Sequence, residues 1–329
     1  MLQLIVSSEG SLTSSQYYPT ITDALNAIPA SCTEPVEILV RPGVYTEKVT
    51  IARPNVTIRG THREECILTY GDYAFALMPD GSKRGTFRSY TCFVDADHVT
   101  LENLTIRNSS APRSKVGQAI ALYADGDHLT LRNCRLESFQ DTLFTGPLPP
   151  TALQPGGFTG PKEFAPRRVG RQLYENCTIC GDIDFIFGSA IAFFDRCEIV
   201  SVVSEEGTAG ILGYATAAST PEGLPYGYVF DHCRFTGNLP KGSVYLGRPW
   251  RDYAKTVLLH CYLGEHIHPA GFHDWNKPAA RERCCYAEYQ NFGPGASASA
   301  RDSFVHQLSE EEAALYTRDR VLNCPVTSL

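Results

Sequence analysis

The 329-residue chain has no long hydrophobic run. No stretch approaches the roughly 20 consecutive apolar residues that a membrane-spanning helix needs. The apolar start, residues 2–6, is too short for the core of a signal peptide and has no basic residues before it. We therefore expect a soluble, cytoplasmic protein with no membrane partner, although a secreted chain that had lost its signal peptide would look the same.

Basic clusters and long helical patterns are also missing. The net charge is -7 and the sequence contains no basic run, so nucleic acids and anionic membrane surfaces are poor candidates as partners. Glycine, proline, tyrosine and phenylalanine are abundant, with 27, 21, 17 and 16 residues respectively. This composition favours an all-β chain that is rich in turns.

Short helices are expected only near the two ends of the chain. Thr20 and Asp23 form a helix start, and apolar residues continue on one face to Ile28, which predicts a short helix capping the fold. Ser309 and Glu312 form a capping box that predicts a second helix, running to about Arg320 along the outside. Between them, short apolar strands broken by turns begin at residues 37–40, 42–45 and 56–60.

A six-residue pattern recurs six times: apolar, any residue, Asn/His/Arg, Cys/Leu, any residue, apolar. Its copies are residues 101–106, 131–136, 174–179, 194–199, 230–235 and 258–263. The spacing between copies varies, as expected of a solenoid in which each coil keeps its strand and varies its loops. The repeat predicts one parallel β-helix domain over residues 1–329, with successive coils about 4.8 Å apart.

The sequence has twelve cysteines, but a chain of this length can build a core without disulfides. Five of them share one position of the repeat and predict an inward stack of small apolar side chains: Cys134, Cys177, Cys197, Cys233 and Cys261. Cys177 and Cys180 also have the spacing of a zinc or redox pair. Residues three apart on a strand point to opposite faces, however, and no second pair follows. We expect no metal and no cofactor, and a local structural role for Cys284 and Cys285.

Asp184 lies in the segment Gly-Asp-Ile-Asp-Phe-Ile-Phe-Gly, where apolar neighbours place its carboxylate in a partly dry site. It follows Cys177 by seven residues, and Asp141 follows Cys134 by seven, so the two acids have equal phase in successive coils. Two carboxylates at such a short separation cannot both ionise freely, so we expect a raised pKa for one and a low pKa for the other. This division suits an acid and a nucleophile. The alternative is that one of the two merely caps a turn.

Two other segments are candidates for the same site. Residues 145–168 are rich in proline and cannot form a regular helix or strand, so they form either a substrate-shaping wall or a passive insertion. In residues 246–250, Arg248 has the geometry to hold a buried carboxylate ionised, and Trp250 to stack on a sugar ring. The alternative is a structural salt bridge beside a core tryptophan.

Five segments resemble, in the same order, the signature segments of the pectin methylesterases: residues 43–47, 117–122, 140–143, 184–188 and 246–250. The resemblance spans nearly the whole chain, and the five segments together are highly specific. It implies a right-handed parallel β-helix. It also implies hydrolysis of the C6 methyl esters of galacturonate units, in pectin or in methylated oligogalacturonides, without a metal. We expect a monomer.

The resemblance also implies roles for six residues. Asp184 matches the family's nucleophile and Asp141 its general acid and base. The remaining matches are two oxyanion donors and two residues that fix the nucleophile and the substrate: Gln118, Gln140, Arg248 and Trp250. Each glutamine alternatively satisfies buried backbone groups.

Three aromatic residues are left out of the expected site, because such residues belong to the core more often than to a cleft: Phe185, Phe187 and Tyr214. Two local features depart from the family's pattern. The proline-rich segment lengthens the usual spacing between the acids, and Phe272 stands where the family often has tryptophan.

Other functions are consistent with the sequence. A β-helical lyase would need a calcium-binding cluster of acids with a basic residue, and none is evident, while a polygalacturonase is a further rival. An esterase or thioesterase of the same fold would share the acyl chemistry. A non-catalytic β-helix that binds carbohydrate is the alternative from another class, because fold does not fix function. The presence of both acids, both glutamines and the arginine argues against lost activity.

Overall fold

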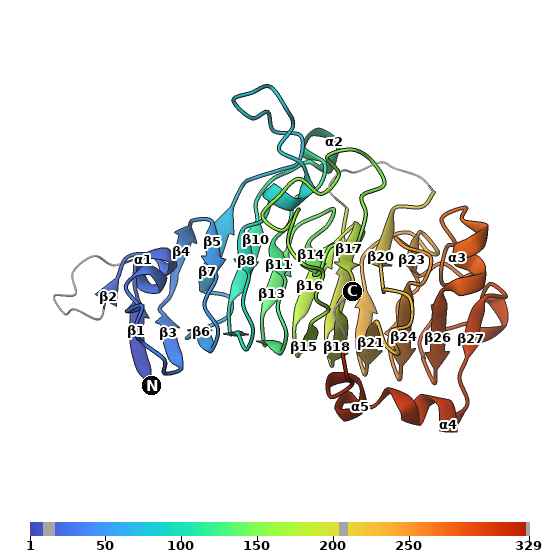
Figure 1. The fold of residues 1–329 in the computed structure, drawn as a ribbon. Coiled ribbons are helices and arrows are strands. Elements are labelled where there is room, and N and C mark those ends of the chain that lie inside the picture. Colours follow the sequence, from blue (N-terminus) through green and yellow to red (C-terminus); the bar gives the residue numbers. More distant parts are fainter. Residues whose placement is uncertain (9–16, 204–209, 327–329) are drawn as a thin grey trace.

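The computed structural model describes residues 1–8, 17–203 and 210–326. In this part of the chain the backbone winds into three sheets whose paired strands all run parallel, and most coils contribute one strand to each sheet (Figure 1). The molecule is thus a right-handed parallel β-helix, as predicted.

The three sheets run the length of the solenoid. Sheet A contains β1 (Leu2–Val6), β2 (Tyr17–Tyr18), β3 (Val36–Val40), β6 (Val56–Gly60), β9 (Thr100–Glu102), β12 (Leu129–Arg132), β15 (Arg171–Glu175), β18 (Ile191–Asp195), β21 (Tyr228–Asp231), β24 (Lys255–Leu259), β26 (Cys285–Tyr289) and β27 (Val305–Gln307). Sheet B contains β4 (Gly43–Thr46), β7 (Cys66–Tyr70), β10 (Thr105–Asn108), β13 (Arg135–Glu137), β16 (Thr178–Gly181), β19 (Glu198–Ser201), β22 (Arg234–Thr236) and β25 (Tyr262–Leu263). Sheet C contains β5 (Val49–Ile51), β8 (Cys92–Val94), β11 (Leu122–Ala124), β14 (Leu143–Thr145), β17 (Ile183–Gly188), β20 (Gly213–Ala218) and β23 (Val244–Gly247).

The six-residue repeat is the turn from sheet A to sheet B. Its third residue has a positive φ, between 48° and 53°, in every copy: Asn103, Asn133, Asn176, Arg196, His232 and His260. Asparagine and histidine tolerate this left-handed conformation better than most side chains, which explains their preference there. The turns stack coil on coil, and the Asn133 amide donates to Oδ1 of Asn103 at 2.7 Å.

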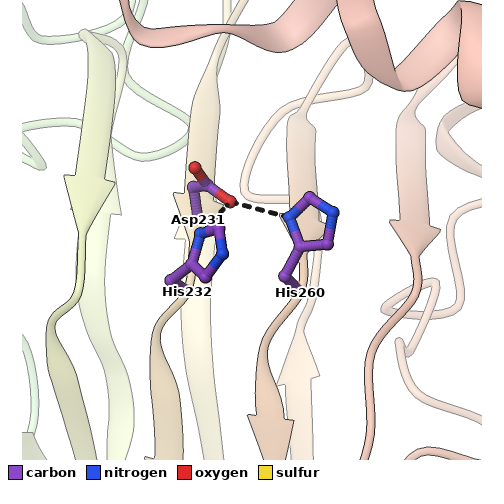
Figure 2. Close-up of side chains that lie close together, drawn as sticks. All are labelled: Asp231, His232 and His260. Atoms are coloured by element: carbon purple, nitrogen blue, oxygen red, sulfur yellow. Dashed lines mark hydrogen bonds and ion pairs between the residues drawn. The ribbon is translucent and has the colours of Figure 1, made fainter.

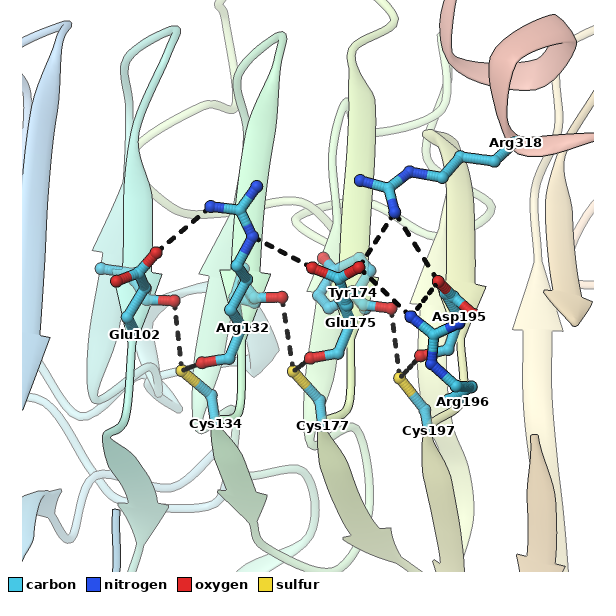
Figure 3. A network of polar contacts seen from close by, with 12 residues as sticks. Glu102, Arg132, Cys134, Tyr174, Glu175, Cys177, Asp195, Arg196, Cys197 and Arg318 are labelled. Carbon is cyan, nitrogen blue, oxygen red and sulfur yellow. Dashed lines mark hydrogen bonds and ion pairs between the residues drawn. The ribbon is translucent and has the colours of Figure 1, made fainter. Parts of the chain in front are cut away.

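The next residue of the turn points inward. The five cysteines at this position are at most 1% exposed, and none forms a disulfide. Their thiols donate to carbonyl groups of the preceding coil, for example from Cys134 to Leu101 at 3.3 Å and from Cys197 to Tyr174 at 3.2 Å (Figure 3). The predicted cysteine stack is therefore confirmed, with each thiol filling space and satisfying a backbone oxygen.

The N-terminal end is covered by α1 (Ile21–Asn26), which lies against β1, β2, β3 and β5. Thr20 caps this helix by accepting a hydrogen bond from the Asp23 N–H at 3.0 Å. The predicted capping helix is present but ends before Ile28. Two further short helices are α2 (Arg113–Val116) and α3 (Pro278–Arg283), and single 3-10 turns occur at Thr86–Arg88, Ala298–Ala300 and Ala314–Tyr316.

The continuous C-terminal helix predicted from Ser309 to Arg320 is wrong. The Ser309 capping box starts only α4 (Glu310–Ala313), which gives way to a 3-10 turn. Thr317 is extended, with φ -67° and ψ 151°, and its side chain caps a new helix, α5 (Arg318–Leu322). The break lets α5 pack against β15 and β18 on the outside of sheet A. Within the described ranges, no helix is both long and apolar enough to span a bilayer.

A second apolar cluster lies apart from the interior of the solenoid, on sheet C. It comprises Phe87, Phe93, Ile120, Tyr123, Phe144, Leu148, Phe158, Phe187 and Ala217. Leu148 and Phe158 come from the proline-rich segment, which therefore packs onto this sheet as a cover. The candidate site lies beside this cluster.

Candidate active site

Asp141 and Asp184 stand on neighbouring rungs at the start of sheet C. Strands β14 and β17 pair in parallel with Leu143 opposite Ile186, so each acid lies two residues before a paired position. The Asp141 N–H also donates to the Ile183 carbonyl at 3.1 Å. The equal phase predicted from the cysteine spacing is thus confirmed.

The backbone at both acids is unusual. Asp141 has φ 67° and Asp184 φ 51°, in the left-handed region that most residues avoid. The register between β17 and β20 also shifts between Ile183 and Ile186, and such an irregularity turns a side chain away from the regular alternation. Aspartate tolerates this conformation better than most residues, and the turns of the solenoid use it too, so it orients the two acids without marking the site by itself.

All six predicted site residues line one cavity of about 250 Å³. Its lining residues are Thr86, Phe87, Gln118, Gln140, Asp141, Gly157, Asp184, Phe187, Ala217, Arg248, Trp250 and Trp275. Two larger hollows, of about 500 and 370 Å³, lie elsewhere on the molecule, but neither contains this pair of acids. We therefore identify the site by its chemistry rather than by its volume.

Arg248 holds Asp184 through a two-pronged ion pair. Its Nε donates to Oδ1 at 2.8 Å and its Nη2 to Oδ2 at 2.7 Å. The guanidinium carbon lies 3.9 Å from the ring centre of Tyr214 and 3.7 Å from that of Trp275, so two aromatic rings enclose it. The ion pair anticipated from the sequence is present, and the enclosing rings fix the plane of the donor.

The two acids differ in proton affinity. Burial raises the pKa of Asp184 above its ordinary value, although the hydrogen bonds and charge of Arg248 oppose this shift. Burial raises the pKa of Asp141 well above its ordinary value, and the negative charge of Asp184 adds to the effect. The prediction of a low pKa at one acid is therefore wrong, because both carboxyl groups are buried. The pair still titrates unequally, so Asp141 retains a proton when Asp184 has lost its own.

Gln118 and Gln140 line the cavity with side-chain amides that form no hydrogen bond to another described residue. Their backbone carbonyls accept from the N–H groups of Ala74 and Ala119, at 2.9 and 3.1 Å. Among the described residues, neither side-chain amide hydrogen-bonds to another protein group. The structure thus gives no support to the alternative that they satisfy buried backbone, and it leaves amide donors available beside the acids.

Trp250 is half-buried at the cavity wall. The rings of Phe87, Phe158 and Phe187 lie around it, with centroid distances of 6.5, 6.2 and 5.7 Å. Of the aromatic residues left out of the expected site, Phe185 is part of the solenoid's interior, whereas Phe187 lines the cavity.

Residues 3–147 and 167–324 match the family model for pectinesterase. This chain belongs to the pectinesterase family. Its members are carboxylic ester hydrolases.

Two curated relatives and one solved structure illustrate the similarity. The chain is 32% identical over 315 residues to probable pectinesterase/pectinesterase inhibitor 23 of Arabidopsis thaliana, covering 93% of this chain but only 50% of that protein. It is 30% identical over 302 residues to pectinesterase 31 of the same plant, covering 90% of this chain and 86% of that protein. A pectin methylesterase crystallised in complex with a hexasaccharide is 29% identical, with a TM-score of 0.79. The match covers 98% of this chain and 97% of that one.

The family match omits residues 148–166, which lie within the proline-rich segment. As predicted, no helix or strand forms between the end of β14 and the start of β15. Gly157 lines the cavity, and the Thr151 carbonyl accepts a hydrogen bond from Arg251 at 2.8 Å. The segment is therefore an insertion relative to the family model and also part of the cavity wall.

Besides Phe187 and Tyr214, two further residues that shape the site were missed from the sequence. Trp275, which encloses Arg248, has φ 56°, a strained value for a bulky side chain. Lys277 donates to the carbonyls of Pro249 and Trp250 at 2.8 and 3.2 Å, and so ties down the segment after Arg248. The only sign of them in the sequence was that they closely follow Phe272, where the chain departs from the family's pattern.

Phe272 itself raises no packing problem. It is 1% exposed and stacks on Tyr286 with ring centres 4.1 Å apart and an interplanar angle of 11°. The departure from the family's tryptophan is therefore accommodated in the interior, away from the cavity lining.

Proposed function

We propose that this protein hydrolyses the C6 methyl esters of galacturonate units in pectin or in methylated oligogalacturonides, releasing methanol and a free carboxylate. The observation that carries the proposal is the pair of buried acids on neighbouring rungs, one of them clamped by Arg248. Membership of the pectinesterase family supports the reaction class. The hexasaccharide bound to the related pectin methylesterase supports an oligosaccharide as ligand.

In the first half-reaction, ionised Asp184 attacks the ester carbonyl. The carbonyl oxygen takes up negative charge, which the side-chain amides of Gln118 and Gln140 stabilise by hydrogen bonds. Asp141 is the acid of the pair that keeps its proton, and it gives this proton to the departing methoxide. Methanol leaves, and the galacturonyl group is bound to Asp184 as an acyl-enzyme.

In the second half-reaction, Asp141 is ionised and acts as the general base. It takes a proton from a water molecule, whose oxygen attacks the acyl carbon and displaces Asp184. The immediate product is a galacturonic acid unit, which loses its proton to solvent and becomes a free carboxylate, and both acids return to their starting states. Arg248 keeps the Asp184 carboxylate oriented through both steps by its two hydrogen bonds.

Trp250 is the proposed contact for a sugar ring, since its half-buried indole lines the cavity beside the acids. The proline-rich segment encloses the same side of the cavity through Gly157. A wall at this position favours short or terminal units over the middle of a long polymer. We therefore expect oligomers to be the better substrates.

Methanol release tests the proposal. Wild-type protein and Asp184→Ala would each be incubated with highly methylated pectin and with methylated di- and trigalacturonate. Release from the oligomers by the wild type, little release from polymer and none by the variant are expected. The proposal is overturned if a folded wild-type protein releases no methanol from either substrate. Equal rates on polymer and oligomer would overturn only the preference for short chains.

A further inference from the structure

We propose that Asp231, His232 and His260 form a binding site for a divalent transition metal of the zinc type, linking two successive coils (Figure 2). Nδ1 of His232 lies 2.8 Å from Oδ1 of Asp231, and Nδ1 of His260 lies 3.0 Å from the same oxygen. Two imidazole nitrogens and one carboxylate oxygen are a recurrent protein ligand set for zinc, with water completing a tetrahedron.

The ligand atoms are close to the separation that one ion needs. All three lie within 4.8 Å of one another. Atoms bound to a single zinc ion at ~2.1 Å are at most ~4.2 Å apart, so a modest movement of the side chains suffices. The side chains of His232 and His260 are 60% and 36% exposed, which leaves them room to rotate.

The charges along this face leave Asp231 without a permanent cation. Side chains on the outer face of sheet A follow one another in register from coil to coil: Arg59, Glu102, Arg132, Glu175, Asp195, Asp231 and Leu259. The sequence of charges alternates at first and then presents three acids in a row. A third acid with no arginine beside it attracts a cation.

Arginines neutralise the first two of these acids. Glu175 pairs with Arg132 at 3.0 Å and with Arg318 at 2.9 Å, and Asp195 pairs with Arg196 at 2.8 Å (Figure 3). The next coil offers Leu259 where another arginine would be needed. In the described part of the chain, the ion-pair partners of Asp231 are His232 and His260 alone, and neither is an arginine or a lysine.

The turn conformation does not by itself require histidine here. The equivalent left-handed positions of three earlier coils are occupied by asparagine. His232 and His260 stack with ring centres 4.8 Å apart, and Tyr289 packs edge-on against His260 at 5.4 Å. The stacked turns thus bring both Nδ1 atoms to one carboxylate oxygen, although Asp231 and His260 are 29 residues apart in sequence.

This site is separate from the acids of sheet C, because it lies on the turn between sheets A and B. A bound ion would join the turns after β21 and β24 and stabilise the folded state, since binding to the folded form alone raises its stability. No metal was expected from the sequence, because the cysteine spacing contains no second pair. Coil stacking assembles this ligand set without a local motif.

A second histidine pair provides a matched control. His98 and His128 stack at 4.9 Å with an angle of 7°, and both also have positive φ, 56° and 54°. The nearby Asp127 is already engaged, because Arg171 binds it through Nε and Nη2. This pair therefore has stacked imidazoles but no uncommitted carboxylate, and we expect it to bind no metal.

The test is a zinc titration of chelator-treated protein, in competition with a chromophoric chelator. Three proteins are compared: wild type, the double variant His232→Asn with His260→Asn, and the control double variant His98→Asn with His128→Asn. Asparagine suits all four left-handed turns, so the fold should persist, as circular dichroism would verify. The cysteines are unchanged in every protein and contribute equally.

Wild type and control are expected to bind one zinc ion more than the His232/His260 variant, and to show a larger zinc-induced rise in melting temperature. Ester hydrolysis by all three proteins should be similar, so loss of the proposed activity would be a distinct result. Equal zinc stoichiometry and equal thermal shifts in all three proteins would overturn the proposal. If the double variant does not fold, Asp231→Asn gives the same readout.

Discussion

At the scale of single residues, two aspartates of identical chemistry are made different by their neighbours. Asp184 is held by the guanidinium of Arg248. Asp141 is buried beside the negative charge of Asp184, and both effects raise its pKa. The nearby arginine lowers the energetic cost of ionising one acid, and the like charge raises it for the other. The proposed division of roles between nucleophile and acid rests on this asymmetry.

The raised pKa of Asp141 carries a consequence for stability. An unfolded aspartate ionises at a pKa of ~3.9, so the folded state holds a proton that the unfolded state releases as pH rises. The free energy of unfolding therefore falls as the pH rises above the pKa of Asp141 in the unfolded state, and it stops falling once the pH exceeds the pKa in the folded state. Asn cannot ionise and removes this penalty. We expect Asp141→Asn to melt at a higher temperature than wild type at pH 7, with the gap narrowing toward pH 4, and to lose methanol release. A lower melting temperature at pH 7 would contradict the account.

Arg248→Lys should weaken catalysis while keeping the positive charge. Lysine cannot form the two-pronged contact or fill the space between two rings. Hydrogen bonds to charged groups contribute ~1.5–3 kcal/mol, so kcat/KM should fall ~10- to 100-fold. The pKa of Asp184 should rise further when these bonds are lost, because they oppose its upward shift. Since Asp184 acts in its ionised form, the acidic limb of the kcat/KM profile should move to higher pH. An unmoved limb would show that Arg248 does not control this carboxyl group.

Trp275→Ala removes one of the rings that enclose Arg248. A desolvated cation–π contact contributes ~0.5–2 kcal/mol, so we expect kcat/KM to fall ~2- to 30-fold through a looser Arg248. Trp275→Phe retains a ring and is the matched control, with a smaller loss expected. Equal losses in the two variants would indicate that the indole acts on substrate and not on the arginine.

At the scale of elements, the proline-rich segment is the feature that separates this chain from its family model. Residues 148–166 lie outside the match, yet Phe158 packs against Trp250 and Gly157 lines the cavity. Replacing residues 149–166 by a short Gly-Ser linker should raise the ratio of the rate on polymer to the rate on methylated trigalacturonate. The melting temperature would be measured alongside, because the segment also covers the aromatic cluster on sheet C. A folded deletion variant with an unchanged ratio would rule out a selective wall.

The elements themselves were largely predictable, and the errors have clear causes. The strand at residues 56–60 follows from its own apolar run, and the cysteine stack follows from the six-residue repeat. The helix predicted after Ser309 was too long, because its capping box marks only where the helix starts. Its end depends on the extended backbone of Thr317. That conformation follows from packing against sheet A, which no local pattern reveals.

At the scale of the whole molecule, the solenoid brings together residues that are distant in sequence. Gln118, Asp141, Asp184 and Arg248 come from different coils, and the stacking of equal phases places them around one cavity. The phase of the two acids was readable from the cysteine repeat. Trp275 and Lys277 were not, because they reach the site from a loop whose path no repeat constrains. One raised pKa was predicted, but that both carboxyl pKa values are raised was missed for a similar reason, since burial depends on the folded surroundings.

The central claim is that Asp184 supplies the attacking carboxylate in an ester hydrolase. It is tested most directly by the rate of methanol release from methylated trigalacturonate, comparing wild type with Asp184→Asn. Asparagine has nearly the same shape but lacks the nucleophilic carboxylate. The account predicts that release falls ~10³-fold or more while the protein stays folded, because no covalent intermediate can form. A folded Asp184→Asn protein that retains wild-type release would contradict the account and remove Asp184 from the reaction.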